Sequence, residues 1–249
     1  GHLALTSDTL GSRSTAIGMN TLRDQNFTSG TETYNVAVGH GAGLKVTTGV
    51  QNTLIGALAG DALTDADKNV AVGYGALTSD TLGSKSVAIG QFTLADQNFT
   101  SATDAFNTAV GFQAGSNVST GIQNVLIGGR TGDALTDADH NVAVGGDSLS
   151  TDTLGSRSVA VGYACLNNQN ITSAAAVNNV AVGFNAGFAM TTGLQNTLIG
   201  GQAGDSLTDA DNNVAVGFLA LSTNQLGSAN TAIGTDSLST SNPSSAALT

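Results

Sequence analysis

A five-residue motif, seen for example as Asn69-Val70-Ala71-Val72-Gly73, recurs thirteen times along the chain. The steps between the glycines that close it run 21, 17, 17 and 17 residues, and this set repeats, so the larger unit is 72 residues long. A fixed period of this kind is typical of repeat architectures, in which each unit contacts mainly its neighbours. The glycines are Gly18, Gly39, Gly56, Gly73, Gly90, Gly111, Gly128, Gly145, Gly162, Gly183, Gly200, Gly217 and Gly234.

The three residues before each glycine predict a β-strand. With the glycine counted as zero, position −1 is Val or Ile, position −3 is Val or Thr, and position −2 is Ala except at Leu54, Leu126 and Leu198. Alternation with period two among β-branched residues is a strand signal. Both strand faces are apolar, so we expect both to be covered. Because glycine permits a sharp bend or a close backbone approach, we expect a second short strand beyond it.

Stacking these units predicts an all-β fold, a parallel β-roll or β-solenoid with 13 coils of 17 or 21 residues. Parallel strands about 4.8 Å apart would give a rod of roughly 60 Å. We expect residues 1–240 to form a single repetitive domain and residues 241–249 to be a linker or a cut end. Position +3 is small in every copy. Position −4 is usually Asn, which has two explanations: an amide ladder along the stack, or a simple preference for turns.

The charge and residue content exclude several classes of function. Charged residues make up 10% of the chain and the net charge is −11, which argues against nucleic acid and against anionic membranes. No apolar run approaches the roughly 18 residues of a membrane span, so we expect no membrane insertion in this segment. Cys165 occupies a small +3 position and is expected to be a buried, inert thiol. His40 and His140 sit at non-equivalent positions, so we predict no catalytic residues, no enzymatic activity and no required cofactor.

The 21-residue coils carry an insertion, which is the candidate ligand-binding segment. Extra residues in a solenoid form loops on one face, often the binding face. The alternative is that the apolar residue of each insertion folds back and fills a corner of the core. The candidate ligand-binding residues are Gln25, Asn26, Phe27, Thr28, Gln97, Asn98, Phe99, Thr100, Gln169, Asn170, Ile171 and Thr172.

An acidic loop before the motif is a candidate calcium site. Oxygen side chains at alternate positions are one way in which loops supply calcium ligands. The alternative is that these residues form Asx turns and keep the surface acidic. The candidate metal ligands are Asp65, Asp67, Asp137, Asp139, Asp209 and Asp211.

A basic residue recurs once in each 72-residue unit, five residues after an aspartate. We expect each such pair to form a solvated surface ion pair, which would contribute little to stability. The pairs are Asp8 with Arg13, Asp80 with Lys85, and Asp152 with Arg157.

Ser86-Val87-Ala88-Ile89-Gly90 and its regularly spaced counterparts, with a small residue three places on, resemble the head repeats of YadA-like trimeric autotransporter adhesins. They also resemble the Asn-Thr-Ala-Val-Gly-type repeats of phage tail-fibre and bacterial trimeric fibre proteins. The resemblance covers residues 14–238. It implies a left-handed parallel β-roll and a homotrimer. The coils of the YadA head are shorter than those of this chain, and we expect neither a coiled-coil stalk nor a membrane anchor within residues 1–249.

The sequence therefore predicts a segment of a non-enzymatic, trimeric surface fibre or adhesin. The segment would be a structural shaft or a head, and it would present or perform attachment to a cell surface or a glycan receptor. We expect it to be extracellular, on a bacterial surface or in a virion. The first alternative is a bacteriophage tail-fibre shaft, and a further one is a calcium- or ice-binding β-solenoid. The irregular use of Thr at position −3 disfavours ice binding. Gly1-His2 is typical of the remnant of a cleaved tag.

Overall fold

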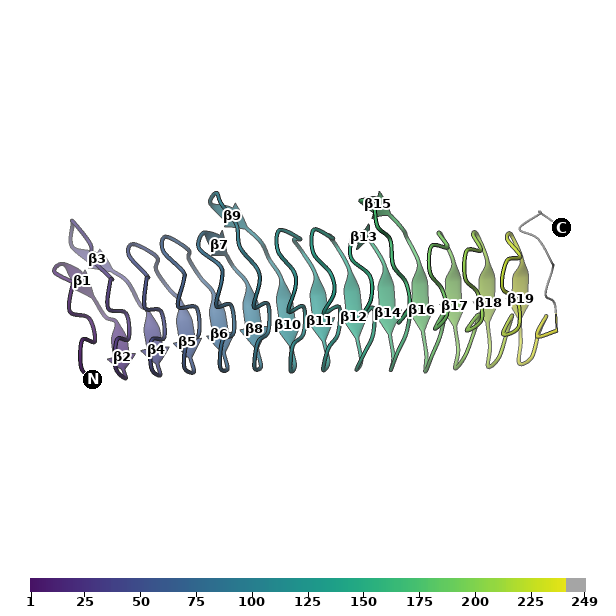
Figure 1. Cartoon of the computed structure of the whole chain (residues 1–249), viewed down its shortest axis with the longest axis horizontal. Coiled ribbons are helices and arrows are strands. Elements are labelled where there is room, and N and C mark those ends of the chain that lie inside the picture. The colour runs from purple at the N-terminus through teal and green to yellow at the C-terminus, as the bar shows by residue number, and fades with distance from the viewer. Residues whose placement is uncertain (241–249) are drawn as a thin grey trace. The chain divides into compact units, whose positions relative to one another are not determined.

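The computed structural model describes residues 1–240 and contains strands, turns and irregular segments, with no helix in that range. The predicted linker or cut end at 241–249 lies outside the described residues. The chain divides into two compact units, Gly1–Asn124 and Val125–Thr249. In each unit a three-residue strand recurs before every motif glycine, and successive strands lie side by side (Figure 1). Each unit is a parallel β-solenoid, and together the units make about thirteen turns.

The first unit contains six motif strands and four two-residue strands. The motif strands are β2 (Thr15–Ile17), β4 (Val36–Val38), β5 (Thr53–Ile55), β6 (Val70–Val72), β8 (Val87–Ile89) and β10 (Thr108–Val110). The two-residue strands pair within the 21-residue coils, β1 (Gly11–Ser12) with β3 (Thr31–Glu32) and β7 (Gly83–Ser84) with β9 (Thr103–Asp104).

The described part of the second unit, residues 125–240, contains seven motif strands and one two-residue pair. The motif strands are β11 (Val125–Ile127), β12 (Val142–Val144), β14 (Val159–Val161), β16 (Val180–Val182), β17 (Thr197–Ile199), β18 (Val214–Val216) and β19 (Thr231–Ile233). The two-residue pair is β13 (Gly155–Ser156) with β15 (Ala175–Ala176).

Neighbouring motif strands are parallel and pair residue for residue. Thr53 of β5 lies opposite Val70 of β6, which lies opposite Val87 of β8. The same register holds in the second unit, where Val142 of β12 lies opposite Val159 of β14. The prediction of parallel strands stacked one coil above another is therefore confirmed in both units.

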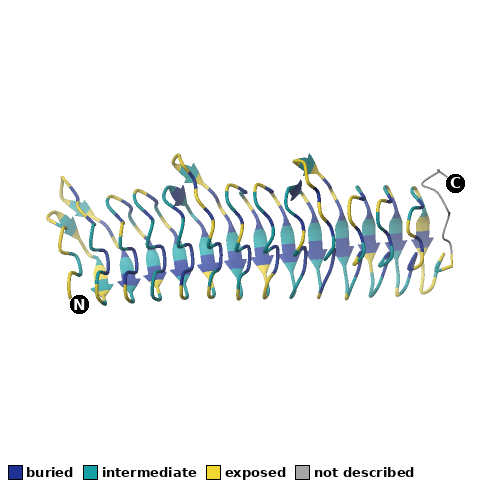
Figure 2. Cartoon of the chain, viewed as in Figure 1, coloured by how far each residue is buried: buried dark blue, intermediate teal, exposed yellow. Residues whose placement is uncertain are grey.

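The core of each coil is built from the −2 and +3 side chains. In β5, Leu54 is fully buried between two less buried neighbours, and Ala71 of β6 is buried in the same way. Figure 2 shows buried and intermediate stretches recurring on successive motif strands. Ala76, at position +3, is also fully buried. The alanines at these positions are small because the interior of a coil with such short sides has room for little else. Leucines at −2 and +4 fill the remaining volume, and Leu54, Leu77 and Leu94 are among the largest fully buried side chains.

The motif glycine is required by close backbone contact between coils. Gly73 has φ of +136°, and a Cβ atom there would lie 2.4 Å from the carbonyl oxygen of Gly90 in the next coil. A non-glycine residue would be strained by φ and would collide with the neighbouring backbone. The predicted close approach at this position is confirmed.

The second strand predicted after the glycine is wrong, because this segment is a turn. Residues 40–45 are turn residues, and Leu44 donates its N–H to the Gly41 carbonyl. The +2 and +4 residues adopt a left-handed backbone conformation, as Asn20 (φ 58°) and Leu22 (φ 46°) show. Two left-handed residues with a single residue between them bend the chain too tightly for an extended strand.

Candidate functional site

The outward face of the motif strands is the first candidate site. Side chains at −1 and −3 point away from the core and are half-buried or exposed, and no segment within residues 1–240 buries them. Ile55 is 39% exposed, Ile89 38% and Ile127 39%. All described side chains at these two positions are Val, Ile or Thr, so the face carries no charge. An exposed apolar surface that recurs on successive strands is a candidate interaction site.

Exposed aromatic residues follow the motif glycine in several coils, at position +1. Tyr74 and Phe112 occupy that position in the first unit, and Tyr163, Phe184 and Phe218 occupy it in the second. Each is roughly half exposed. Aromatic side chains are enriched where proteins bind partners, because they bury much area at little cost in conformational entropy.

Inside the coil, the −4 asparagines form a ladder of buried amides. The Asn69 Oδ1 atom accepts the N–H of Ser86 at 2.9 Å, and its Nδ2 atom donates to the carbonyl of Gly83 at 2.9 Å. The Asn69 N–H in turn donates to Oδ1 of Asn52 at 2.9 Å. Of the two explanations offered for these asparagines, the structure shows the ladder along the stack.

The insertions of the 21-residue coils are anchored by a buried polar network. Gln97 donates to Oδ2 of Asp80 at 2.6 Å and to Oγ of Ser86 at 3.2 Å, and accepts from Nδ2 of Asn107 at 2.9 Å. Burial raises the pKa of Asp80, although its hydrogen bonds from Gln97 and from the N–H groups of Gly83 and Phe99 oppose the shift. The same contacts link Asp8, Ser14, Gln25 and Asn35, and again Asp152, Ser158, Gln169 and Asn179.

The structure separates the predicted ligand-binding residues into buried and exposed groups. Gln25, Gln97 and Gln169 are fully buried in the network, and Phe27, Phe99 and Ile171 are each 6% exposed. The apolar residues therefore fold back into the core, as the alternative interpretation proposed. The side chains left on the surface are those of Asn26, Thr28, Asn98, Thr100, Asn170 and Thr172. Ligand binding by these loops stays a prediction.

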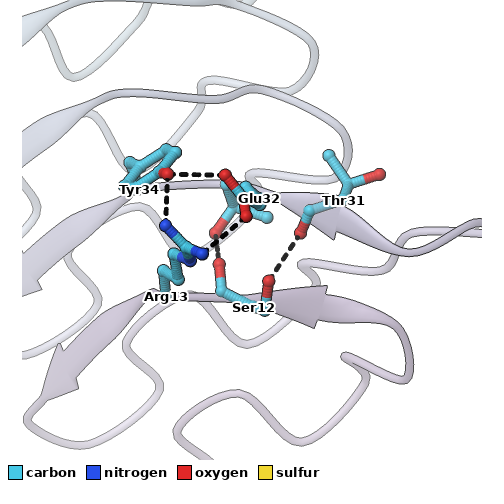
Figure 3. A network of polar contacts seen from close by, with 6 residues as sticks. Ser12, Arg13, Thr31, Glu32 and Tyr34 are labelled. Atoms are coloured by element: carbon cyan, nitrogen blue, oxygen red, sulfur yellow. Dashed lines mark hydrogen bonds and ion pairs between the residues drawn. The ribbon is translucent and has the colours of Figure 1, made fainter.

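The predicted ion pairs with the preceding aspartates are wrong. Arg13 pairs with Glu32 at 2.7 Å and donates to the Tyr34 hydroxyl at 2.7 Å, beside the β1–β3 pair (Figure 3). In the equivalent coil, Lys85 pairs with Asp104. The aspartates could not fulfil the predicted role, because Asp80 and Asp152 are fully buried as acceptors for the insertion. In the third predicted pair, Asp152 likewise belongs to the buried network, where it accepts hydrogen bonds from the insertion.

The candidate calcium ligands interact mainly with neighbouring coils. The Asp65 carboxylate accepts from Oγ1 of Thr48 at 2.5 Å, and that of Asp67 accepts from the N–H of Val50 at 2.8 Å. Asp209 and Asp211 make the equivalent two contacts, with Thr192 and Leu194. Asp139 donates its backbone N–H to Oγ of Ser156. The side chain of Asp137 is exposed. Within residues 1–240, no three His, Cys, Asp or Glu side chains form a group that could hold a metal ion. Calcium binding stays a prediction.

Cys165 is buried, as expected, and donates from Sγ to the carbonyl of Gly183 at 2.6 Å. Burial raises the pKa of its thiol, which keeps it protonated. His40 and His140 are exposed side chains on the first and second unit, respectively. No helix in the described part of the chain is long and apolar enough to cross a membrane.

No family model, no curated protein and no solved structure matches the chain. The class of the protein comes from its own structure, which is an all-β parallel β-solenoid built from short repeats.

Proposed function

We propose that this chain is a segment of a non-enzymatic, homotrimeric extracellular fibre that presents or performs attachment to a surface. The observation that carries the proposal is the outward strand face, which carries only Val, Ile and Thr side chains, and therefore no charge, at every described −1 and −3 position. Leaving such a face in water is unfavourable by about 25 cal/mol for each Å² of apolar surface.

The partner that fits this face best is another copy of the chain. The exposed rows recur once per coil, at the spacing of parallel strands, so a partner must present apolar rows with the same spacing. A second copy does so by construction. Closed rotational symmetry then hides the face on every copy and leaves none available for further growth.

The number three and the left-handed sense of the coil come from the resemblance to YadA-like head repeats and to trimeric fibre proteins. The same resemblance supports an extracellular location on a bacterial surface. The second candidate, a phage tail-fibre shaft, shares the trimer and the stacked coils and differs only in the particle that carries them. The acidic composition and the sparse charge fit both.

Light scattering coupled to size exclusion tests the assembly. The expected mass is about 74 kDa, three times the 24.6 kDa of the chain. Replacing two exposed residues of the face, Ile55→Lys with Ile89→Lys, should reduce the mass to that of one chain, because buried unpaired charges are costly. The matched control, Ser101→Lys on an exposed insertion, should remain trimeric. A wild-type protein that is monomeric at micromolar concentration would refute the proposed assembly.

A further inference from the structure

A groove in the second unit lies between the +2 and +5 side chains of four successive coils. Its volume is about 420 Å³, within the range of small-molecule sites of roughly 300–1,000 Å³. One wall carries the +2 residues Arg130, Asp147 and Asn185, and the other carries the +5 residues Asn167 and Phe188. Its floor lies at Ala164, whose small side chain leaves the space open.

The polar side chains of the groove are held in place by one another. Arg130 pairs with Oδ1 of Asp147 at 2.8 Å. Asn167 donates from Nδ2 to the Asp147 carbonyl and to Oγ of Ser150, both at 2.8 Å. The Oδ1 atom of Asn185 is buried and has no hydrogen-bond partner in the protein. Because this atom is almost inaccessible, the groups that can meet a ligand are Arg130 and Asp147, whose side chains are 58% and 21% exposed.

An aromatic surface lies beside these polar groups. The ring of Tyr163 is stacked on that of Phe184, with centroids 5.9 Å apart and an angle of 13° between the planes. Stacking fixes the orientation of the Tyr163 ring, although the residue is 54% exposed. Phe188 lines the same groove and is 37% exposed.

The internal repeat shows that the fold does not require these residues. Seventy-two residues earlier, the framework is the same, with Leu54, Gly60 and Leu77 in place of Leu126, Gly132 and Leu149. Two lining residues are kept or nearly kept, since Asp133 corresponds to Asp61 and Ser150 to Thr78, and the other seven differ. Arg130, Asp147, Tyr163, Ala164, Asn167, Asn185 and Phe188 correspond to Leu58, Gly75, Gln91, Phe92, Ala95, Gln113 and Ser116.

The counterpart of Ala164 is Phe92, a large side chain at the position where the groove has its floor. The Phe92 ring packs edge-on against Tyr74, with centroids 5.2 Å apart. Since both arrangements fit the same coil, the open floor and the polar walls of the groove are features of this position and not of the repeat.

We propose that this groove binds a neutral saccharide of one or two sugar units. A guanidinium group, carboxylates and amides that face an aromatic ring match a ligand with many hydroxyl groups and an apolar ring face. Asp133 and Asp147 disfavour anions, and Arg130 disfavours cations. The inference rests on the attachment role proposed above, and gives that role a ligand class and a location.

Isothermal titration calorimetry tests the site, with a panel of neutral hexoses, N-acetylhexosamines and their disaccharides as probes. The wild-type chain should bind at least one of them. Ala164→Phe installs the residue found in the other repeat and should weaken binding at least about tenfold by filling the groove. Tyr163→Gln and Asn167→Ala, which also copy the other repeat, should each do the same.

The matched control is Phe92→Ala, which changes the counterpart position in the first unit and should leave the affinity within about twofold. Circular dichroism of every variant shows whether the fold is retained. Binding of no sugar in the panel, binding only of an anionic sugar or a peptide, or equal affinity in Ala164→Phe would each overturn the proposal. Light scattering on the same samples reports the assembly separately, so a monomer that binds sugar contradicts the trimer alone.

Discussion

Replacing Asn69 by alanine should destabilise the protein strongly, because its amide bonds two buried backbone groups. The Ser86 N–H loses its acceptor and the Gly83 carbonyl loses its donor. An unsatisfied buried polar group costs about 1–3 kcal/mol, so the free energy of unfolding should fall by about 2–6 kcal/mol. Asn69→Asp keeps Oδ1 but directs a second oxygen at the Gly83 carbonyl, and should also be destabilising.

Urea unfolding followed by circular dichroism, at one protein concentration, measures the change through the midpoint at constant slope. The control is Lys68→Ala. Lys68 is the exposed neighbour, and alanine already occupies the equivalent position as Ala229, so its effect should stay within about 0.5 kcal/mol. An Asn69→Ala variant as stable as the Lys68→Ala control would show that the amide ladder does not hold the coils together.

Three further predictions follow from the described contacts. Gly73→Ala should lower the free energy of unfolding by at least about 3 kcal/mol, because the added Cβ atom would collide with the backbone of the next coil. Gly146→Ala should change it little, because a Cβ atom there has no neighbour within 3.5 Å. Similar losses for the two variants in urea unfolding would contradict this. Phe99→Ala should cost about 3–5 kcal/mol and the exposed Thr100→Ala almost nothing in the same assay; a neutral Phe99→Ala would mean that the ring does not fill the core. The pKa of Asp80 is raised in the folded state. Its favourable contribution to the free energy of unfolding is therefore complete below the pKa of the unfolded state, and is lost as pH rises through the pKa of the folded state. The stability of the wild type relative to Asp80→Asn should therefore increase as pH falls from about 7 to about 4, and the opposite slope in parallel unfolding curves would refute the assignment.

The period of the motif was enough to predict the parallel strands and their stacking, because the register of β5 on β6 follows directly from equivalent residues in successive coils. The turn after the glycine could not be predicted in the same way. Left-handed backbone is normally associated with Gly and Asn, whereas here Leu22 and Leu94 adopt it with fully buried side chains. Packing in the coil overrides the local preference of leucine.

The polar network was missed, although one signal for it was present. In the coils followed by an insertion, position −4 is Ser14, Ser86 or Ser158 and not Asn, and the smaller side chain leaves room for the glutamine of the insertion. The features that the copies share do not indicate the groove, because its lining residues are specific to one copy. Residues such as Arg130 and Tyr163 become visible only when the copies are compared for their differences.

The most direct test of the stacked coils is disulfide trapping between equivalent positions, in a Cys165→Ala background. Thr48 and Asp65 lie one coil apart, with their side chains in hydrogen-bond contact, so Thr48→Cys with Asp65→Cys should form an intrachain disulfide. Thr48→Cys with Leu82→Cys spans two coils, about 10 Å, and should not. Mass spectrometry under non-reducing conditions distinguishes the outcomes. The account predicts a bond in the first pair only, and a bond in the second pair but not the first would contradict it.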